Sequence, residues 1–400
     1  MDISENILRY LLIPGAKAVI VVILVATLAG VLTYIERRLL AFLQVRKGPN
    51  RVGPEGILQW VADVVKLLTK EDIVPAKAER FIHFLAPVLV MVPAMTVFAI
   101  LPWGPEFTVR VPGLGKITTA WYATDVNVAL LLVLAITSIG VYGIILGGWA
   151  SNSKYALLGG LRSAAQLISY EVPMGFAIVS AILMARSLSL VEIVEAQRQH
   201  QMWFIVPGLV SFFLYFVSGV AETNRIPFDL PEAESELVAG FHTEYSGFRW
   251  AIFFLSEYAN MITISAIATT LFFGGWLRPF PSVKALAFLD VIPPLLWFVV
   301  KVAVFLFVYI WFRGTFPRYR FDQLMALGWK TLIPMSLVNL VVVAWAALNG
   351  YRGLWVLGGI LWGVFLLALV LTLRSNAKKR ATTARPVTVA PGAAPVEASS

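Results

Sequence analysis

Residues 125–150 read DVNVALLLVLAITSIGVYGIILGGWA and hold no charged residue after Asp125. An apolar run of this length can cross a hydrocarbon layer about 30 Å thick. It must do so as a helix, because lipid offers no partner for exposed backbone groups. Similar apolar stretches lie before and after it, near residues 15–40, 81–103, 163–186, 203–221, 249–277, 289–313, 331–349 and 353–373. The sequence therefore predicts an all-α polytopic membrane protein with about nine transmembrane helices.

The composition excludes several classes of function. Of the 400 residues, 59% are hydrophobic and only 14% are charged, far from the averages of soluble domains. The chain has no cysteine, which excludes disulfides, iron–sulfur clusters and thiol catalysis. Its three histidines lie too far apart in sequence to suggest a local metal site. We therefore expect no metal and no redox centre in this chain, so any electrons must be carried by another chain.

The basic residues predict the orientation. Of the 32 Lys and Arg residues, 22 fall in the segments that one side of the membrane would share, and nine fall on the other side. By the positive-inside rule, the N-terminus lies outside and the C-terminus lies in the cytoplasm. Residues 1–375 then form the transmembrane domain. Residues 376–400 are rich in Ala, Pro, Thr and Val without a helical period, which predicts a disordered cytoplasmic tail.

The first cytoplasmic loop, residues 41–80, contains a short amphipathic pattern. Apolar residues recur at helical spacing at Ile57, Leu58, Val61, Val64, Val65 and Leu68. This pattern predicts an interfacial helix that is too short to span the membrane. Beside the basic turn 44–51, such a helix could frame a side opening for a lipid-soluble ligand with a polar head. The pattern agrees equally with a helix that only anchors the loop.

The loop at 222–248 is acidic, against the trend of cytoplasmic loops. Residues 222–257 hold seven of the 23 acids, opposed only by Arg225 and Arg249. The seven acids are Glu222, Asp229, Glu232, Glu234, Glu236, Glu244 and Glu257. Crowded, partly buried carboxylates cannot all ionise at once, which suits groups that transfer protons near neutral pH. The alternative is a solvated acidic loop.

Two acids lie deeper in the membrane. Glu171 falls within the fourth span, two residues before Pro173, and Glu257 falls within the sixth. A carboxylate at such depth costs several kcal/mol unless it is protonated, paired or hydrated. Pro173 removes a backbone hydrogen bond and can open the helix around Glu171. Lys301, in the seventh span, could balance one of the two acids. A proton path with water is the interpretation we favour over a static ion pair.

Several motifs resemble a known family. They are Glu36-Arg37-Arg38 with Gln44; Arg46-Lys47-Gly48-Pro49-Asn50-Arg51-Val52-Gly53; Ala62-Asp63; Ser169-Tyr170-Glu171-Val172; Glu222 to Leu230; Glu234 to Val238; Glu244-Tyr245-Ser246-Gly247; and Arg320 to Met325. Together they resemble the H subunit of bacterial NADH:quinone oxidoreductase, respiratory complex I, which is homologous to the mitochondrial NADH dehydrogenase membrane subunit 1. The resemblance covers roughly residues 15–349. Two departures are Trp60, where the family usually has Leu-Gln-Pro at 58–60, and Phe321, where Tyr is common.

The resemblance implies a translocase subunit in the bacterial inner membrane. Residues matching the family's quinone-binding chamber are Glu36, Arg37, Arg46, Asp63, Arg225, Phe228 and Glu244. Those matching its proton path are Glu171, Glu222, Asp229, Glu232, Glu234, Glu236 and Glu257. The implied substrate is a quinone, either ubiquinone or menaquinone. Partner subunits would carry FMN and iron–sulfur clusters or resemble antiporters, and no nucleic acid is expected.

Three other functions stay open at this point. The first is the homologous membrane subunit of an energy-converting hydrogenase, in which the acidic residues would serve equally well. The second is a stand-alone cation/proton antiporter, which Glu171 and Lys301 would suit, although no repeat is seen between the halves of the chain. The third is a passive scaffold for a peripheral arm.

Overall fold

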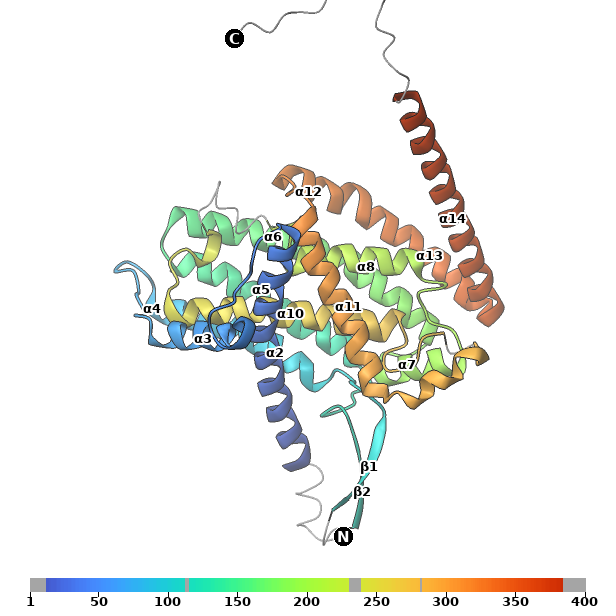
Figure 1. Cartoon of the computed structure of the whole chain (residues 1–400), viewed down its shortest axis with the longest axis horizontal. Coiled ribbons are helices and arrows are strands. Elements are labelled where there is room, and N and C mark those ends of the chain that lie inside the picture. The colour runs from blue at the N-terminus through green and yellow to red at the C-terminus, as the bar shows by residue number, and fades with distance from the viewer. Residues whose placement is uncertain (1–11, 112–114, 230–238, 281–282, 384–400) are drawn as a thin grey trace, which may run out of the picture.

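A computed structural model describes residues 12–111, 115–229, 239–280 and 283–383, and helices dominate it (Figure 1). Within these ranges, seven helical segments are long and apolar enough to cross a membrane. They are α2 (Ile13–Leu43), α4 (Arg80–Thr96) with the 3₁₀ turn η3 (Val97–Ala99), α5 (Ala129–Ala150), α6 (Lys154–Ala185), α10 (Gly247–Phe272), α11 (Pro294–Thr315) and the continuous run of α12 (Phe321–Leu327), the π-helical turn η6 (Gly328–Leu332) and α13 (Ile333–Leu348). The prediction of an all-α polytopic membrane protein is confirmed.

The remaining two predicted spans also contain helices, but the fifth is shorter than expected. α8 (Leu209–Glu222) has 14 residues, so it is about 21 Å long and falls short of a full crossing. The expected span began at 203, yet residues 204–208 form turns that include Pro207, which lacks a backbone donor. The last span lies in α14 (Gly350–Thr383), and residues 384–400 of the predicted tail lie outside the described residues.

The segments between the spans add structure that hydropathy did not predict. An antiparallel hairpin of β1 (Glu106–Val111) and β2 (Gly115–Ala120) follows α4 and projects from the helices (Figure 1). Lys17 of α2 donates a hydrogen bond to the Ala120 carbonyl at 2.8 Å and so ties the hairpin to α2. A short helix, α7 (Leu190–Gln199), precedes α8 and is capped by the Ser189 hydroxyl. Short 3₁₀ turns are η2 (Pro54–Gly56), η4 (Gly240–His242) and η5 (Lys284–Val291).

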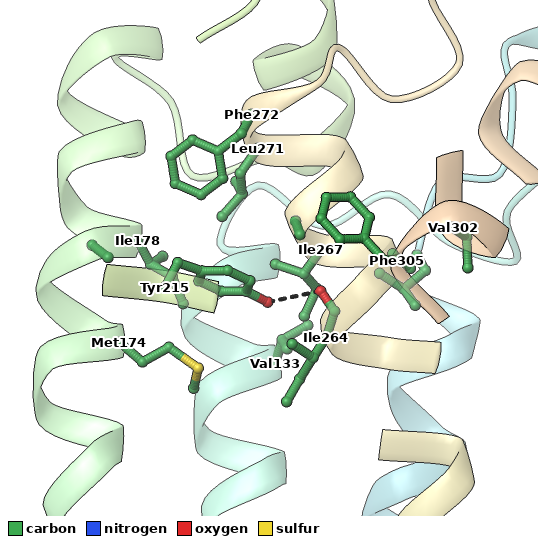
Figure 2. Packing of buried hydrophobic residues seen from close by; sticks show 14 of the residues in the cluster. Val133, Met174, Ile178, Tyr215, Ile264, Ile267, Leu271, Phe272, Val302 and Phe305 are labelled. Carbon is green, nitrogen blue, oxygen red and sulfur yellow. Dashed lines mark hydrogen bonds between the residues drawn. The ribbon is translucent and has the colours of Figure 1, made fainter. Parts of the chain in front are cut away.

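The core lies where α5, α6, α8, α10 and α11 meet. Figure 2 shows Tyr215 of α8 reaching α10, where its hydroxyl donates to the Ile264 carbonyl at 3.1 Å. Phe272 and Phe305 pack beside this contact. A close approach of α4 and α5 requires glycine, because a Cβ at Gly143 would lie 2.5 Å from the Val90 side chain. α6 continues as helix through Pro173, so the proline does not open the helix there.

The predicted amphipathic helix is present as α3 (Gln59–Thr69). It packs against α2 and α10, and α2 itself runs across α10 (Figure 1). The ring of Trp60 lies over Gly30 of α2, where a Cβ would come within 3.1 Å of it. The proline that the family usually has at this position would present no aromatic ring. Trp60 therefore adds a contact between α3 and Gly30 of α2. This arrangement of α2, α3 and α10 positions the site described next.

Candidate functional site

Glu36 lies at the centre of a buried charged cluster between α2, α10 and α11. Its side chain is on the face of α2 that meets these helices and is 3% exposed. The Tyr258 hydroxyl donates to Oε2 at 2.8 Å, and Nη1 of Arg225 lies 3.4 Å from both carboxylate oxygens. Arg313 of α11 donates to Oε1. We call Glu36, Arg225, Tyr258 and Arg313 the Glu36 cluster. Two guanidinium groups and one phenol thus share a single buried carboxylate.

Arg225 connects this cluster to Glu257, the acid of α10. The guanidinium is buried and its central carbon lies 4.3 Å above the centre of the Tyr258 ring, in a cation–π contact. Its charge also interacts with Glu257, one residue before Tyr258. Within the described ranges, Nε and Nη2 of Arg225 have no hydrogen-bond partner. A buried guanidinium with free donors is able to respond when charge nearby changes.

A cavity of about 350 Å³ lies between α2, α3 and α10, and we call it the lateral cavity. Most of its lining is apolar, with Met91, Trp250 and Phe254 among the larger side chains. One end is polar, because Arg37 and Asp63 form an ion pair there at 2.6 Å. Tyr258 also lines this cavity, so a single side chain belongs both to the lateral cavity and to the Glu36 cluster.

A second, smaller cavity of about 50 Å³ lies among α5, α6, α8 and α10, and we call it the acid cavity. Its polar lining residues are Thr137, Ser138, Glu171, Glu222, Thr223, Asn224, Ser256, Glu257 and Asn260. The Ser138 hydroxyl donates to Glu171, and the charges of Glu171 and Glu222 interact. Oε2 of Glu222 is buried without a hydrogen-bond partner in the described part of the chain. A polar cavity of this size accommodates about three water molecules.

Thus the structure brings Glu171, Glu222 and Glu257 together, although they lie 86 residues apart at most in sequence. Asp229 lies elsewhere, in an ion pair with Arg318 at 3.1 Å. Phe228 is buried between the rings of Tyr170 and Tyr319. Glu232, Glu234 and Glu236 lie outside the described residues.

Three of the seven residues that matched the quinone chamber lie outside the Glu36 cluster and the lateral cavity: Phe228, Arg46 and Glu244. Arg46 donates to the Gln44 side chain at 2.7 Å and lines a basic pocket of about 670 Å³ with Arg38 and Lys47. Glu244 is half-buried in the loop before α10 and lines none of these three cavities. Of that set, Arg37 and Asp63 line the lateral cavity, and Glu36 and Arg225 belong to the Glu36 cluster that adjoins it through Tyr258.

Lys301 does not balance a buried acid, so that expectation was wrong. Its ammonium donates to three backbone carbonyls, those of Phe273, Gly275 and Leu277, at 2.6–2.8 Å. These carbonyls lie at and just beyond the C-terminal end of α10, where a helix leaves acceptors unpaired. Lys301 therefore caps the backbone carbonyls at the C-terminal end of α10 and does not neutralise Glu171 or Glu257.

Sequence reasoning also missed Tyr258, Arg313 and the amide of Asn260. Tyr258 follows Glu257 directly, and that adjacency was the available signal for a polar position within an apolar span. Arg313 ends an apolar span and, from its position, resembles a loop residue of the positive-inside type. In the described ranges, no group of three or more His, Cys, Asp or Glu residues is arranged to hold a metal ion.

The fold and the site define a class: a polytopic helical membrane protein with buried titratable groups beside a mostly apolar cavity. Residues 16–344 match the family model described as NADH dehydrogenase. An H subunit of NADH-quinone oxidoreductase from Geobacter sulfurreducens is 52% identical over 333 residues, which are 83% of this chain and 96% of the relative. The corresponding protein of Rhizobium meliloti is 51% identical over 326 residues, 82% and 94% of the two chains. An H subunit from Koribacter versatilis is 46% identical over 396 residues, and the match covers 82% of this chain and 90% of the relative.

The chain therefore belongs to the family of the H subunit of NADH-quinone oxidoreductase, as the motifs of the sequence predicted. It is a multi-pass membrane subunit of an oxidoreductase complex and works with the other subunits of that complex. The helix α14 begins after the residues that match the family model.

Proposed function

We propose that this subunit forms the membrane part of the quinone-binding chamber and couples quinone reduction to proton translocation. One observation carries the proposal: the Glu36 cluster contacts the lateral cavity through Tyr258 and acts on the acid cavity through Arg225 and Glu257. The relatives' names favour a quinone-linked complex over the hydrogenase alternative. Partner subunits would carry FMN and iron–sulfur clusters or resemble antiporters. The proposed membrane is the bacterial inner membrane, with the N-terminus outside and the C-terminus in the cytoplasm.

The lateral cavity suits the two chemical halves of a quinone. Its apolar walls from α2, α3 and α10 match a hydrocarbon tail arriving from lipid. At its polar end, the Arg37–Asp63 pair and the Tyr258 hydroxyl could hydrogen-bond the oxygens of the head group. The basic pocket that includes Arg46 lies beside the same end of α2 and would attract the charge that forms during reduction.

Coupling follows from the electrostatics of the Glu36 cluster. Full reduction of a quinone takes up two electrons, supplied by the partner subunits, and two protons. Negative charge at the head group would draw Arg225 or Arg313 from Glu36, because either guanidinium is stabilised by the nearest anion. Any movement of Arg225 alters the potential at Glu257 and so shifts the protonation of the acid cavity. Asp229 and the acids at 232–236 would continue this path toward the antiporter-like subunits.

Replacing Glu171 or Asp229 with the neutral amide tests the proposal. Because the amide cannot take up or release a proton, Glu171→Gln and Asp229→Asn should each lower proton pumping and quinone reductase activity by at least about tenfold. The measurement compares NADH-driven quinone reduction and acidification in membrane vesicles, with subunit content as the check on assembly. Glu195→Gln is the matched control, since Glu195 is a partly exposed acid of α7 whose side chain pairs with Arg198. Normal pumping in both amide variants would contradict the proposal.

A further inference from the structure

A second cluster of polar side chains joins the beginning of α4 to the beginning of α10. His83 of α4 is fully buried, and its ring stacks on Tyr245 with 4.0 Å between the ring centres. Nη1 of Arg249 lies 3.0 Å from Nδ1 of His83, and Nη2 of Arg249 lies 2.9 Å from the Asp72 carboxylate. We call His83, Tyr245, Arg249 and Asp72 the His83 joint. None of them lines the acid cavity or the lateral cavity.

The His83 joint holds together segments that border both cavities. Asp72 belongs to the segment that directly follows α3, and α3 forms a wall of the lateral cavity. The same segment is bound to the start of α10, because the Ile73 amide donates to the Ser246 hydroxyl at 2.8 Å. On its other side, Tyr245 follows η4, and Phe241 of η4 lines the acid cavity. A change in this joint would therefore move α3 relative to α10.

The contact with Arg249 determines the protonation state of His83. A guanidinium has only donors, so Nδ1 of His83 must accept the hydrogen bond and the imidazole is neutral. Protonation of Nδ1 would remove that acceptor and place an imidazolium against a guanidinium in a buried site. Arg249 would then be repelled, and its ion pair with Asp72 would weaken.

Asp72 and a backbone hydrogen bond with Glu244 offset part of this repulsion. The charged groups that act on His83 are Arg249 from α10 and Asp72 from the segment after α3. At the beginning of α4, Arg80 and the preceding Glu79 are exposed, and α5 carries no charged residue. Glu244 lies next to Tyr245 in the loop before α10 and is half-buried. Burial raises the pKa of the Tyr245 phenol, so this ring stays neutral and provides no counter-charge.

We propose that His83 is a proton-dependent positioning residue that, when neutral, holds Arg249 on Asp72 and fixes the wall of the lateral cavity to α10. Uptake of a proton by His83 from the cytoplasmic side would break the contacts of this joint. The consequence for quinone reduction rests on the proposed function of the lateral cavity. The conformational part does not, because it concerns only the contact between the segment after α3 and the start of α10.

The variant His83→Asn distinguishes the effect of protonation at His83 from the effect of its hydrogen bond with Arg249. The Asn carbonyl oxygen can replace Nδ1 as the acceptor for Arg249 but cannot be protonated in this pH range. We expect equal quinone reductase activity of wild type and His83→Asn at about pH 8, and a roughly tenfold lower wild-type activity relative to the variant at about pH 5. His200→Asn is the matched control, since His200 directly follows α7 and is not part of the His83 joint, and it should follow the wild-type profile. Identical pH profiles of His83→Asn and wild type would overturn the proposal.

A second measurement tests the joint without quinone turnover and without relying on assembly of the His83 variant. The chain has no native cysteine, so Lys70→Cys with Phe248→Cys places the only two spin labels in this subunit, on either side of the joint. In the assembled complex, the distance between the labels should lengthen or broaden between about pH 8 and about pH 5. An unchanged distance distribution would overturn the proposal. If the distance shifts while Glu171→Gln pumps normally, only the proposed function of the cavities fails.

Discussion

Glu36 shows how one residue organises the site at the residue scale. A carboxylate that is 3% exposed would be strongly unfavourable alone, yet it receives hydrogen bonds from Tyr258 and Arg313 and faces Arg225. Such clusters are balanced internally, so their members depend on one another more than on the surrounding packing. The paired charges also leave Arg225 with unused donors in the described part of the chain, which suits a group that changes partners.

Removing the charge of Glu36 should destabilise the subunit. Glu36→Gln would leave two guanidinium groups together without their carboxylate, at a cost of about 3–5 kcal/mol. The measurement is the thermal dissociation temperature of the purified complex, followed by loss of this subunit. Glu55→Gln is the control, because Glu55 is mostly exposed in its pair with Arg38 and should cost at most about 1 kcal/mol. An equal decrease of the dissociation temperature in the two variants would mean that the buried charges of the Glu36 cluster stabilise the subunit no more than an exposed ion pair does.

At the scale of elements, α3 is a helix whose partners determine its role. Its apolar stripe was evident from the spacing of Ile57 to Leu68, and α3 is indeed an amphipathic helix lying against α2 and α10. The choice between an anchoring helix and a cavity wall could not come from spacing alone. Contact of Trp60 with Gly30 and the adjoining volume of about 350 Å³ support the second interpretation.

A side chain at Gly30 should therefore disturb the lateral cavity. Gly30→Val would push the Trp60 ring away from α2, because even a Cβ comes within 3.1 Å of that ring. We expect the KM for quinone to rise about tenfold, equivalent to about 1.4 kcal/mol of binding free energy. NADH oxidation with an artificial acceptor at the peripheral arm should stay unchanged.

Gly175→Ala is the matched control for Gly30→Val. Gly175 also lies within a membrane helix, α6, but nothing would lie within 4 Å of its Cβ. This variant should keep the wild-type KM. A normal quinone KM in Gly30→Val would show that the lateral cavity is not on the quinone's route.

For the whole molecule, the main division lies between residues 16–344 and the helix that follows. The Glu36 cluster and both cavities lie within the part that matches the family model. α14 packs on α13 and α8 and extends away from the other helices (Figure 1). This arrangement predicts that α14 contributes to stability at the edge of the molecule and not to the site.

Truncation after Asn349 tests this division. Removing α14 should leave quinone reductase activity within about twofold of wild type, because no residue of either cavity is lost. Truncation after Arg320 should abolish activity, since it also removes Asn339, which donates to Ser180 and Ser211 and ties α13 to α6 and α8. Activity assays on membranes with equal subunit content provide the measurement. A complete loss of activity on truncation after Asn349 would contradict this prediction and show that α14 supports the site.

The sequence by itself determined the helical spans, the amphipathic helix and the family. Apolar length and helical spacing are local properties, and contiguous motifs such as Arg46 to Gly53 need no fold to be recognised. The tertiary structure alone decided which charges meet. Glu36 lies 189 residues from Arg225 and 277 from Arg313, whereas Lys301 found backbone carbonyls in place of an acid. Such pairs depend on how each helix is rotated and where it crosses its neighbours, and packing between distant segments settles both.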